Sequence, residues 1–184
     1  MKKYFCLFLL IFLPTLLVAG ERGFASMEEE NTCSPVKNGK ICYSDDVSLR
    51  TISKGRLFAI INAWAHDNYG TDFVYSNVSA NKNKGSILIS SKVELWLSER
   101  ESTMMKFRVR IQCYDNRYTI EITDISYQYD PTNARKVKSY PAESVILKEG
   151  QGNRVDIIKN PLLFCEATYY FADKLMGQIY NEVK

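Results

Sequence analysis

The residue best suited to acid–base chemistry is His66, the only histidine in the 184-residue chain. A Ser–His or Cys–His catalytic pair would have to use it. His66 lies in "AWAHDNYG", near the end of a segment with helical periodicity, where the helix dipole favours a cation. We therefore expect a surface position and no catalytic residues. An envelope hydrolase that uses His66 with a Ser, Cys or Asp partner is the alternative hypothesis.

Carboxylates and glycines do not form a recognisable cofactor motif. The acidic clusters Asp45–Asp46 and Glu99–Glu101 lack the regular ligand spacing of a calcium loop. A zinc site is not indicated, because the sequence has no Cys-x-x-Cys and a single histidine. There is also no phosphate-binding glycine loop followed by Lys-Ser/Thr. We expect no metal site and no cofactor.

Tyrosine is abundant, with 12 in the chain, and several lie close together in the sequence. On an exposed sheet face they would suit contact with a ligand or a protein. In a second interpretation they line the edge of an ordinary core. The candidate binding residues are Tyr114, Tyr118, Tyr127 and Tyr129, and Tyr140 follows them.

The first twenty residues, "MKKYFCLFLLIFLPTLLVAG", have the charge–apolar–small order of a secretory signal peptide. Cleavage after Gly20 or after Ala25 fits, and an uncleaved membrane anchor is the alternative. We expect an exported protein, periplasmic or extracellular, that is not an integral membrane protein after cleavage. Residues 21–38 are polar and turn-rich and predict a flexible leader. Residues 39–184 are the right size for a single domain.

The charge is nearly balanced, with 24 basic and 21 acidic residues. Without Lys2 and Lys3 the counts are 22 and 21, which is too even for a protein that mainly neutralises phosphates. We therefore expect no nucleic-acid partner. The local basic stretches Arg108–Arg110 and Asn133–Lys138 are interpreted as a solvated strand face and a solvated loop.

Four cysteines follow the signal peptide, at positions 33, 42, 113 and 165. In an oxidising compartment they allow two disulfides in any of three pairings. Cys113 shares a strand face with apolar residues, and Cys165 lies in an apolar helical segment. Buried free thiols that behave as small hydrophobic residues are therefore equally compatible with the sequence.

The first half of the domain predicts a strand followed by a helix. "KICYSDDVSLR" has alternating apolar residues with an interruption at Asp45–Asp46. "TISKGRLFAIINAWAHDNYG" is helical, with Ser53 as its N-cap and Gly70 at its end. Its predicted buried face consists of Leu57, Ile60, Ile61, Trp64 and Ala65.

Several antiparallel strands come next. "DFVYSNVSA" and "GSILISSKVELWL" flank the turn "NKNKG". "MMKFRVRIQCY" alternates apolar residues with Lys106, Arg108, Arg110 and Gln112, as in a strand with one wet face. Asp115–Asn116 predicts a tight primed turn, after which Tyr118, Ile120 and Ile122 point inward.

The last part of the chain predicts a long connection and a closing helix. The connection after Pro131 contains a short helical segment, "AESVILKE". The closing helix begins at Asn160–Pro161, with an apolar stripe of Phe164, Ala167, Phe171, Leu175 and Ile179. The predicted fold class is α+β, an antiparallel meander sheet with two helices packed on one face.

The ordered set "GKICYSDDVSL", "SKGRLFAIINAWAHDNYG", "VYSNVSANKNKGSILI" and "MKFRVRIQCYDNRYTIEITDISY" resembles a family of exported bacterial proteins. That family is a domain of unknown function with a TATA-box-binding-protein-like (TBP-like) fold, β-α-β4-α. The resemblance covers about Gly39 to Asp130, and the closing helix more loosely. It implies a fold and no catalytic residues, because a fold does not carry a function with it.

Two functions are compatible with these observations. The first is a non-catalytic exported binding or interaction module of the bacterial cell envelope. Its sheet face, or a cleft between sheet and helices, would hold an unknown envelope protein, a lipid or a small apolar ligand. The second is the hydrolase built on His66. A packed core would favour protein contact, and an apolar pocket beneath the helices would favour a small ligand.

Overall fold

The computed structural model describes residues 34–72, 74–129, 138–147 and 158–184. The chain divides into two compact units, Met1–Asn31 and Thr32–Lys184, and the described residues belong to the second. The predicted signal peptide and residues 21–33 lie outside them. Among the helices that the structure describes, none is long and apolar enough to cross a membrane.

The described unit contains eight strands and three helices. In chain order they are β1 (Val36–Lys37), β2 (Lys40–Ile41), β3 (Tyr43–Ser48), α1 (Lys54–Tyr69), β4 (Ser76–Asn81), β5 (Ser86–Ser98), β6 (Glu101–Tyr114), β7 (Arg117–Tyr129), β8 (Lys138–Pro141), α2 (Ala142–Ile146) and α3 (Pro161–Val183).

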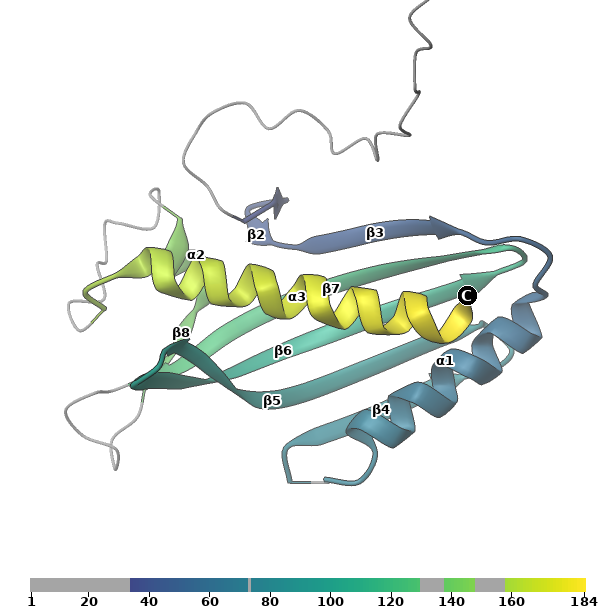
Figure 1. Ribbon diagram of the computed structural model, residues 1–184, viewed down its shortest axis with the longest axis horizontal. Helices are drawn as coiled ribbons and strands as arrows, with labels where there is room; N and C mark the ends of the chain where they lie inside the picture. Colours follow the sequence, from purple (N-terminus) through teal and green to yellow (C-terminus); the bar gives the residue numbers. More distant parts are fainter. Residues whose placement is uncertain (1–33, 73, 130–137, 148–157) are drawn as a thin grey trace, which may run out of the picture. The chain divides into compact units, whose positions relative to one another are not determined.

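The main sheet has the order β3-β7-β6-β5-β4, and β8 pairs with the C-terminal end of β7. All of its pairings are antiparallel. Strands β4 to β7 form the predicted meander, and β3 adds to β7. Figure 1 shows α1 and α3 over the same face of this sheet. The predicted α+β class, with two helices on one face, is confirmed.

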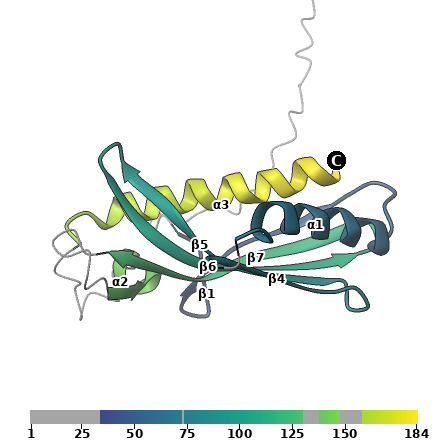
Figure 2. The same ribbon diagram turned by 90° about the horizontal axis from the view of Figure 1, so that it is seen from below.

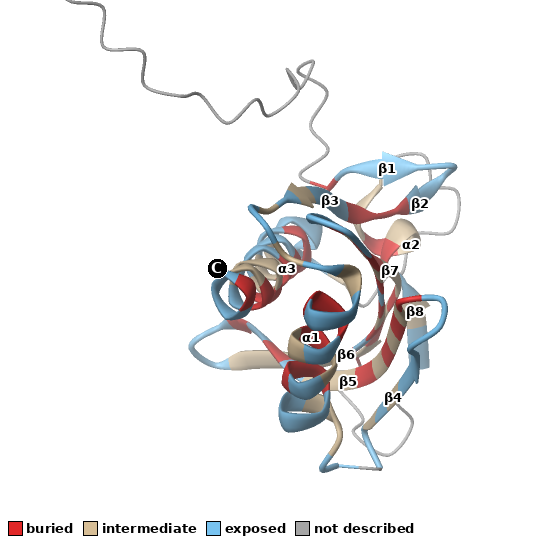
Figure 3. Ribbon diagram, turned by 90° about the vertical axis from the view of Figure 1, so that its right-hand side faces the viewer, coloured by how far each residue is buried: buried red, intermediate tan, exposed pale blue. Residues whose placement is uncertain are grey.

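The core lies between this inner face and the two helices, within the curve of the sheet in Figure 3. Alternate residues of the three long strands β5, β6 and β7 are buried there, as in Ile87 and Ile89 of β5 or Val109 and Ile111 of β6. A chain of edge-to-face rings crosses the core: Trp64–Tyr69, Tyr69–Phe107 and Phe107–Phe171. These contacts join both helices to β6.

Helix α1 begins and ends where its sequence predicts. The Ser53 hydroxyl accepts a hydrogen bond from the Arg56 N–H at 3.4 Å. The buried face is Leu57, Phe58, Ile61, Trp64 and Ala65, with Ile60 half-buried. Gly70 ends the helix at φ −94°, outside the left-handed region. Its lack of a side chain matters sterically, because a Cβ would lie 2.5 Å from the His66 carbonyl oxygen.

The Asp115–Asn116 turn joins β6 to β7, but the prediction of a primed turn is wrong in detail. Of the two residues, Asn116 has a positive φ, 58°, whereas a type I′ turn needs both. Both side chains hold the connection from β3 to α1. Asp115 Oδ1 accepts from the Lys54 N–H at 2.8 Å, and Asn116 Oδ1 accepts from the Ile52 N–H at 2.8 Å.

A β-bulge interrupts the β6–β7 ladder between Lys106 and Arg108. On β7 the irregularity lies around Asp124, which has a φ of 54°. The extra residue shifts the alternation of β7 by one. Ile120 and Ile122 point inward before the bulge, and Ile125 and Tyr127 point inward after it.

The fold begins earlier than the predicted leader boundary at residue 38. Strands β1 and β2 form a hairpin around Asn38–Gly39, whose φ values of 54° and 73° suit a two-residue primed turn. Ser34 is buried, and its hydroxyl oxygen lies 2.7 Å from the Tyr43 hydroxyl oxygen. Residues 34–38 therefore belong to the folded unit, because they contribute a hairpin and a buried polar contact.

Two details differ in the last part of the chain. The buried stripe of α3 is Phe164, Cys165, Thr168, Ala172, Leu175, Ile179 and Val183. Phe164, Leu175 and Ile179 are buried as predicted, whereas the predicted Ala167 and Phe171 are half-buried. Pro161 begins α3 as predicted, but the Asn160 side chain makes no capping bond. The short helix α2 forms within "AESVILKE", and β8 was not predicted.

Candidate functional site

Three of the four candidate tyrosines belong to the core. Tyr118 and Tyr127 are almost fully buried, and Tyr129 is 8% exposed. The Tyr127 and Tyr129 rings both pack edge-on against Phe164 of α3. Tyr114 is 40% exposed and lies beneath the Arg117 guanidinium, 4.6 Å from the ring centroid. The structure therefore does not gather these side chains on an exposed face.

The buried tyrosine hydroxyls have partners inside the fold. The hydroxyl oxygen of Tyr127 lies 2.7 Å from Thr168 Oγ1, and the Tyr129 hydroxyl donates to the Glu101 carboxylate. Burial raises the pKa of Tyr127, and it raises the pKa of Tyr129 to about 12. These hydroxyls therefore stay protonated at neutral pH and serve the packing of α3.

His66 is exposed in the last turn of α1. Within the described part of the chain, its side chain takes part in none of the hydrogen bonds or ion pairs. No described Ser, Cys or Asp side chain is bonded to it as a catalytic pair requires. This placement fits the predicted surface role at a helix C-terminus.

The four cysteines do not behave alike. Cys165 is disulfide-bonded, whereas Cys42 and Cys113 are buried free thiols. Cys33 lies outside the described residues. Burial raises the pKa of Cys42, and it raises the pKa of Cys113 to about 11. Both thiols are therefore protonated at neutral pH, which makes them poor nucleophiles.

The acidic clusters are not built as metal sites. Asp45 and Asp46 are exposed on β3, at the edge of the sheet, and Asp46 pairs with Arg117 at 3.0 Å. Glu101 accepts the Tyr129 hydroxyl. Among the residues that the structure describes, no group of three His, Cys, Asp or Glu side chains could hold a metal ion.

The outer face of the sheet, opposite α1 and α3, carries a set of cationic side chains. On β6, Lys106, Arg108 and Arg110 point outward at every second residue, about 6.8 Å apart along the strand. Lys92 of β5 lies on the same face. We call these four residues the cationic row. Figure 2 shows α1 and α3 on the opposite side of the strands.

Lys92 and Lys106 stand directly opposite each other in the β5–β6 register. Like charges in direct cross-strand positions destabilise a sheet. The Lys92 ammonium lies 5.5 Å from the centroid of the Tyr75 ring. No carboxylate of the described residues forms an ion pair with either lysine. The contact with the Tyr75 ring offsets part of the repulsion between the two lysines, but no ion pair of the described residues does.

The carboxylates nearest the row already have partners. Asp124 bonds both Arg108 at 2.7 Å and Lys40 at 3.1 Å, and the Lys40 bond is the largest cause of the lowered pKa of Asp124. Glu121 is opposite Arg110 in register, yet it bonds Lys37 of the β1–β2 hairpin at 2.6 Å. Arg110 therefore has no ion-pair partner among the described side chains.

A shallow groove of about 450 Å³ crosses this face at Arg110. Seven of its ten lining residues are polar or charged, and they come from β4 to β7: Ser79, Asn81, Ser86, Arg110, Gln112, Thr119 and Glu121. The geometry provides cations and amide or hydroxyl groups for an anionic surface. It provides no nucleophile with an activating base.

Sequence reasoning noticed the alternation of Lys106, Arg108 and Arg110 but assigned these side chains to a solvated strand face. It missed that Lys92 faces Lys106, because that contact depends on the register of two strands. The β-branched and aromatic pattern identifies each strand, whereas the β5–β6 register follows from the Ser98–Glu101 turn and from a β-bulge in β5 between Trp96 and Ser98.

Comparison with known proteins places the fold. The model of a family described as a domain of unknown function (DUF4468) with TBP-like fold matches residues 43–128. A TBP-like protein from Parabacteroides distasonis ATCC 8503, with a crystal structure at 1.90 Å, is 52% identical. The match covers 82% of this chain and 97% of that one, with a TM-score of 0.77.

A DUF4468 family protein from Bacteroides ovatus ATCC 8483, solved at 1.49 Å, has the same fold at 17% identity. That match covers 82% of this chain and 90% of the other, with a TM-score of 0.68. No curated protein matches the chain. With 52% identity over nearly the whole Parabacteroides protein, the chain belongs to the DUF4468 family of domains of unknown function with a TBP-like fold.

Proposed function

We propose that this protein is an exported, non-catalytic binding module of the bacterial cell envelope, and that its outer sheet face holds the acidic surface of a partner protein. The observation that carries the proposal is the cationic row, in which Lys92 and Lys106 oppose each other without a carboxylate. An acidic side chain between them would remove their repulsion. Complementary charge of this kind favours encounter and orients the partner.

A protein partner suits this surface better than a small apolar ligand. Binding pockets for small molecules are concave and enclose most of the ligand, whereas this groove is shallow and open to solvent. Beneath the helices the side chains of strands and helices fill the core, as the ring chain from Trp64 to Phe171 illustrates. A packed core leaves the outer face as the better candidate.

A nucleic acid is a poorer fit to the same face. Four carboxylates, Asp46, Glu94, Glu121 and Asp124, lie among its cations. A continuous polyanion would meet these carboxylates along its path. A folded protein can place single acidic side chains between them, so mixed charge favours protein recognition.

Two observations support export. The N-terminal twenty residues have the composition of a signal peptide. Cys165 is disulfide-bonded, and disulfides persist mainly in oxidising compartments such as the periplasm. The expected location is therefore outside the cytoplasm.

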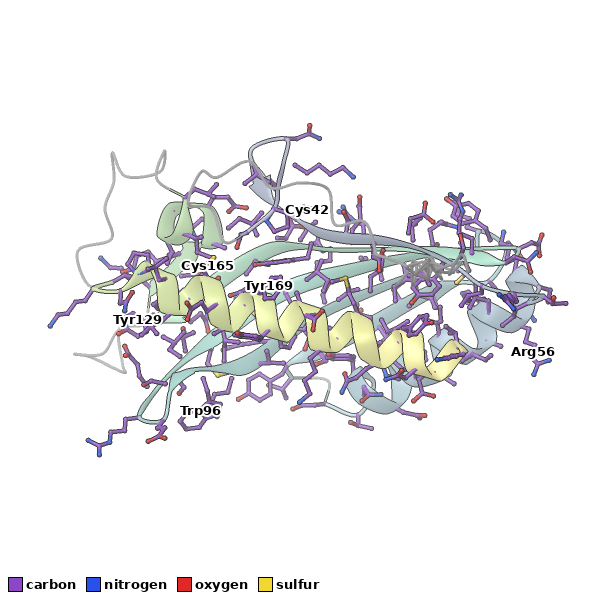
Figure 4. The ribbon with its side chains drawn as sticks, turned by 45° about the horizontal axis from the view of Figure 1, so that its top comes forward. Cys42, Arg56, Trp96, Tyr129, Cys165 and Tyr169 are labelled. Carbon is purple, nitrogen blue, oxygen red and sulfur yellow. The ribbon has the colours of Figure 1, made fainter. Side chains whose placement is uncertain are left out.

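The test is affinity capture of the full-length chain, tagged at the exposed C-terminal Lys184, from its native host. The variant Lys106→Glu/Arg110→Gln removes charge from the row. The control Arg56→Gln/Lys174→Glu makes the same change in net charge at exposed positions on α1 and α3; Figure 4 shows Arg56 at the start of α1, pointing outward. Thermal melting establishes that both variants fold.

We expect the row variant to lose at least about tenfold of the captured partner, equivalent to about 1.4 kcal/mol of binding free energy. The control should capture as much as the wild type. Equal capture by both double variants would overturn the assignment of the outer face. Fractionation of the tagged chain into the cytoplasm would overturn export.

A further inference from the structure

Two arginines of the cationic row, Arg108 and Arg110, differ in their ion pairs. The Arg108 guanidinium donates to Asp124 Oδ2 at 2.7 Å. Arg110 is directly opposite Glu121 in the β6–β7 register, yet the structure, which describes both side chains, contains no ion pair between them. Opposite charges in this arrangement normally stabilise a sheet. The cause of the missing pair therefore lies outside the two strands.

Lys37 of the β1–β2 hairpin supplies that cause. Its ammonium donates to Glu121 Oε1 at 2.6 Å, and this bond is the largest cause of the raised pKa of Lys37. Glu121 nevertheless lines the same groove as Arg110. Directly opposite residues have Cβ atoms about 4.5–5.5 Å apart, which is within reach of both side chains. Without Lys37, the Glu121 carboxylate would be free to turn to Arg110.

The hairpin does not depend on the Lys37 side chain for its position. The Cys42 N–H donates to the Pro35 carbonyl oxygen at 2.9 Å. The Ile41 N–H donates to Glu143 Oε1 of α2 at 2.9 Å. The Lys37 side chain is 59% exposed. A substitution of this side chain should therefore leave the hairpin in place.

The surroundings of Arg110 suit a carboxylate that comes from another molecule. The Arg110 side chain is exposed, and a guanidinium can bind a carboxylate through two parallel N–H···O bonds. The groove around it also contains the hydroxyl groups of Ser79, Ser86 and Thr119, which can donate to the same carboxylate. A single acidic side chain would therefore find several donors here.

We propose that Arg110 binds an acidic side chain of the partner protein, and that Lys37 keeps Arg110 available by holding Glu121 away from it. Arg110 is then the residue that recognises the partner, and Lys37 is a positioning residue that acts through Glu121. This inference rests on the proposed outer-face function. It adds an anchor residue to that function and explains why the anchor has no partner within the fold.

The first test follows the Arg110 guanidinium in the full-length chain without any ligand. Hydrogen exchange of the Arg110 Nε–H, measured by NMR at mildly acidic pH, reports whether a carboxylate is bonded to the guanidinium. The signal is assigned by its loss in Arg110→Lys. Lys37→Met should slow the exchange about two- to fivefold, equivalent to about 0.4–1 kcal/mol, as expected for an exposed ion pair.

Lys40→Met is the matched control for this test. It removes the same charge from the same hairpin, but the carboxylate that it releases is Asp124, so Arg110 exchange should keep the wild-type rate. Lys37→Met/Glu121→Gln also removes the competing carboxylate and has the net charge of the wild type. Its exchange rate, and that of Lys37→Arg, should equal the wild-type rate. Thermal melting establishes that the variants fold.

The second test adds a probe, the peptide acetyl-hexaglutamate-amide, at low ionic strength. The peptide should shift the Arg110 Nε–H signal of the wild-type chain. It should bind Lys37→Met about two- to fivefold more weakly than Lys40→Met, which has the same net charge. The double variant Lys37→Met/Glu121→Gln should regain the wild-type affinity. A merely structural role of Lys37 would not be rescued by a change at Glu121.

Two outcomes would overturn the inference. One is unchanged Arg110 exchange in Lys37→Met, which would show that Glu121 does not turn to Arg110. The other is a wild-type Arg110 signal that does not respond to hexaglutamate.

Affinity capture separates this inference from the function on which it rests. If Lys106→Glu/Arg110→Gln loses the partner while Lys37→Met captures as much as the wild type, the outer-face function stands and the role of Lys37 is refuted. If Lys106→Glu/Arg110→Gln captures as much as its control, the outer-face function itself is refuted.

Discussion

Phe107 occupies the centre of the ring chain between the two helices and β6, and its truncation should be costly for the core. The ring is 3% exposed. It meets Tyr69 at 6.2 Å and 78° and Phe171 at 4.8 Å and 66°. Phe107→Ala should therefore lower the free energy of unfolding by about 3–5 kcal/mol, as for other large buried aromatics.

Phe107→Leu separates the two contributions to that loss. Leucine keeps most of the buried volume but loses both edge-to-face contacts, which contribute about 0.5–1.5 kcal/mol each. We expect a loss of about 1–3 kcal/mol, smaller than that of the alanine variant. The matched control is Trp96→Ala, which removes an exposed aromatic and should change stability by less than about 0.5 kcal/mol.

The assays are urea unfolding and thermal melting, both under non-reducing conditions because Cys165 is disulfide-bonded. At about 2–4 °C per kcal/mol for a domain of this size, Phe107→Ala should lower the melting temperature by about 6–20 °C. A loss below about 1 kcal/mol, close to that of Trp96→Ala, would refute the view that Phe107 joins the helices to the sheet.

Three other changes test separate parts of the fold. Thr168→Val should cost about 1–3 kcal/mol in urea unfolding, because it leaves the buried Tyr127 hydroxyl without its partner; adding Tyr127→Phe should recover part of the loss, and no recovery would contradict the pairing. Gly70→Ala should lower the melting temperature although φ is allowed, because its Cβ would meet the His66 carbonyl oxygen at 2.5 Å; an unchanged melt would show that the helix end relaxes. Burial raises the pKa of Tyr69 to about 12, above its value of about 10 in the unfolded chain. The stability that the buried, protonated Tyr69 hydroxyl contributes is therefore complete below pH 10 and is lost as the pH rises towards 12. Urea midpoints across this range should fall less steeply in Tyr69→Phe.

The long periodic elements could be predicted because their side chains repeat over many residues. Helix α1 shows five buried residues at helical spacing, and β6 alternates from Thr103 to Cys113 without a break. The hairpin around Asn38–Gly39 was missed because its strands have two residues each. Strand β8 follows a connection with no period, and its pairing with β7 depends on tertiary contacts.

The candidate site was harder to predict than the fold. Tyr118 and Tyr127 differ in parity along β7, so simple alternation places them on opposite faces. The bulge at Asp124 brings both inward, and no residue type in "TDIS" announces it. The cationic row could be recognised in "KFRVR", but its exposure depends on which face α1 and α3 cover. Which face the helices cover is determined by the packing of the whole core and not by the sequence of one strand.

The bonds that Asp115 and Asn116 make to the start of α1 divide the loops into those that tolerate insertions and those that do not. A reporter peptide placed between Asp115 and Asn116 would break the contacts with Ile52 and Lys54 and release the helix start. Glu99 and Arg100, at the opposite hairpin tip, are exposed and bear no such attachment. That tip is where a label or an inserted domain should leave the fold intact.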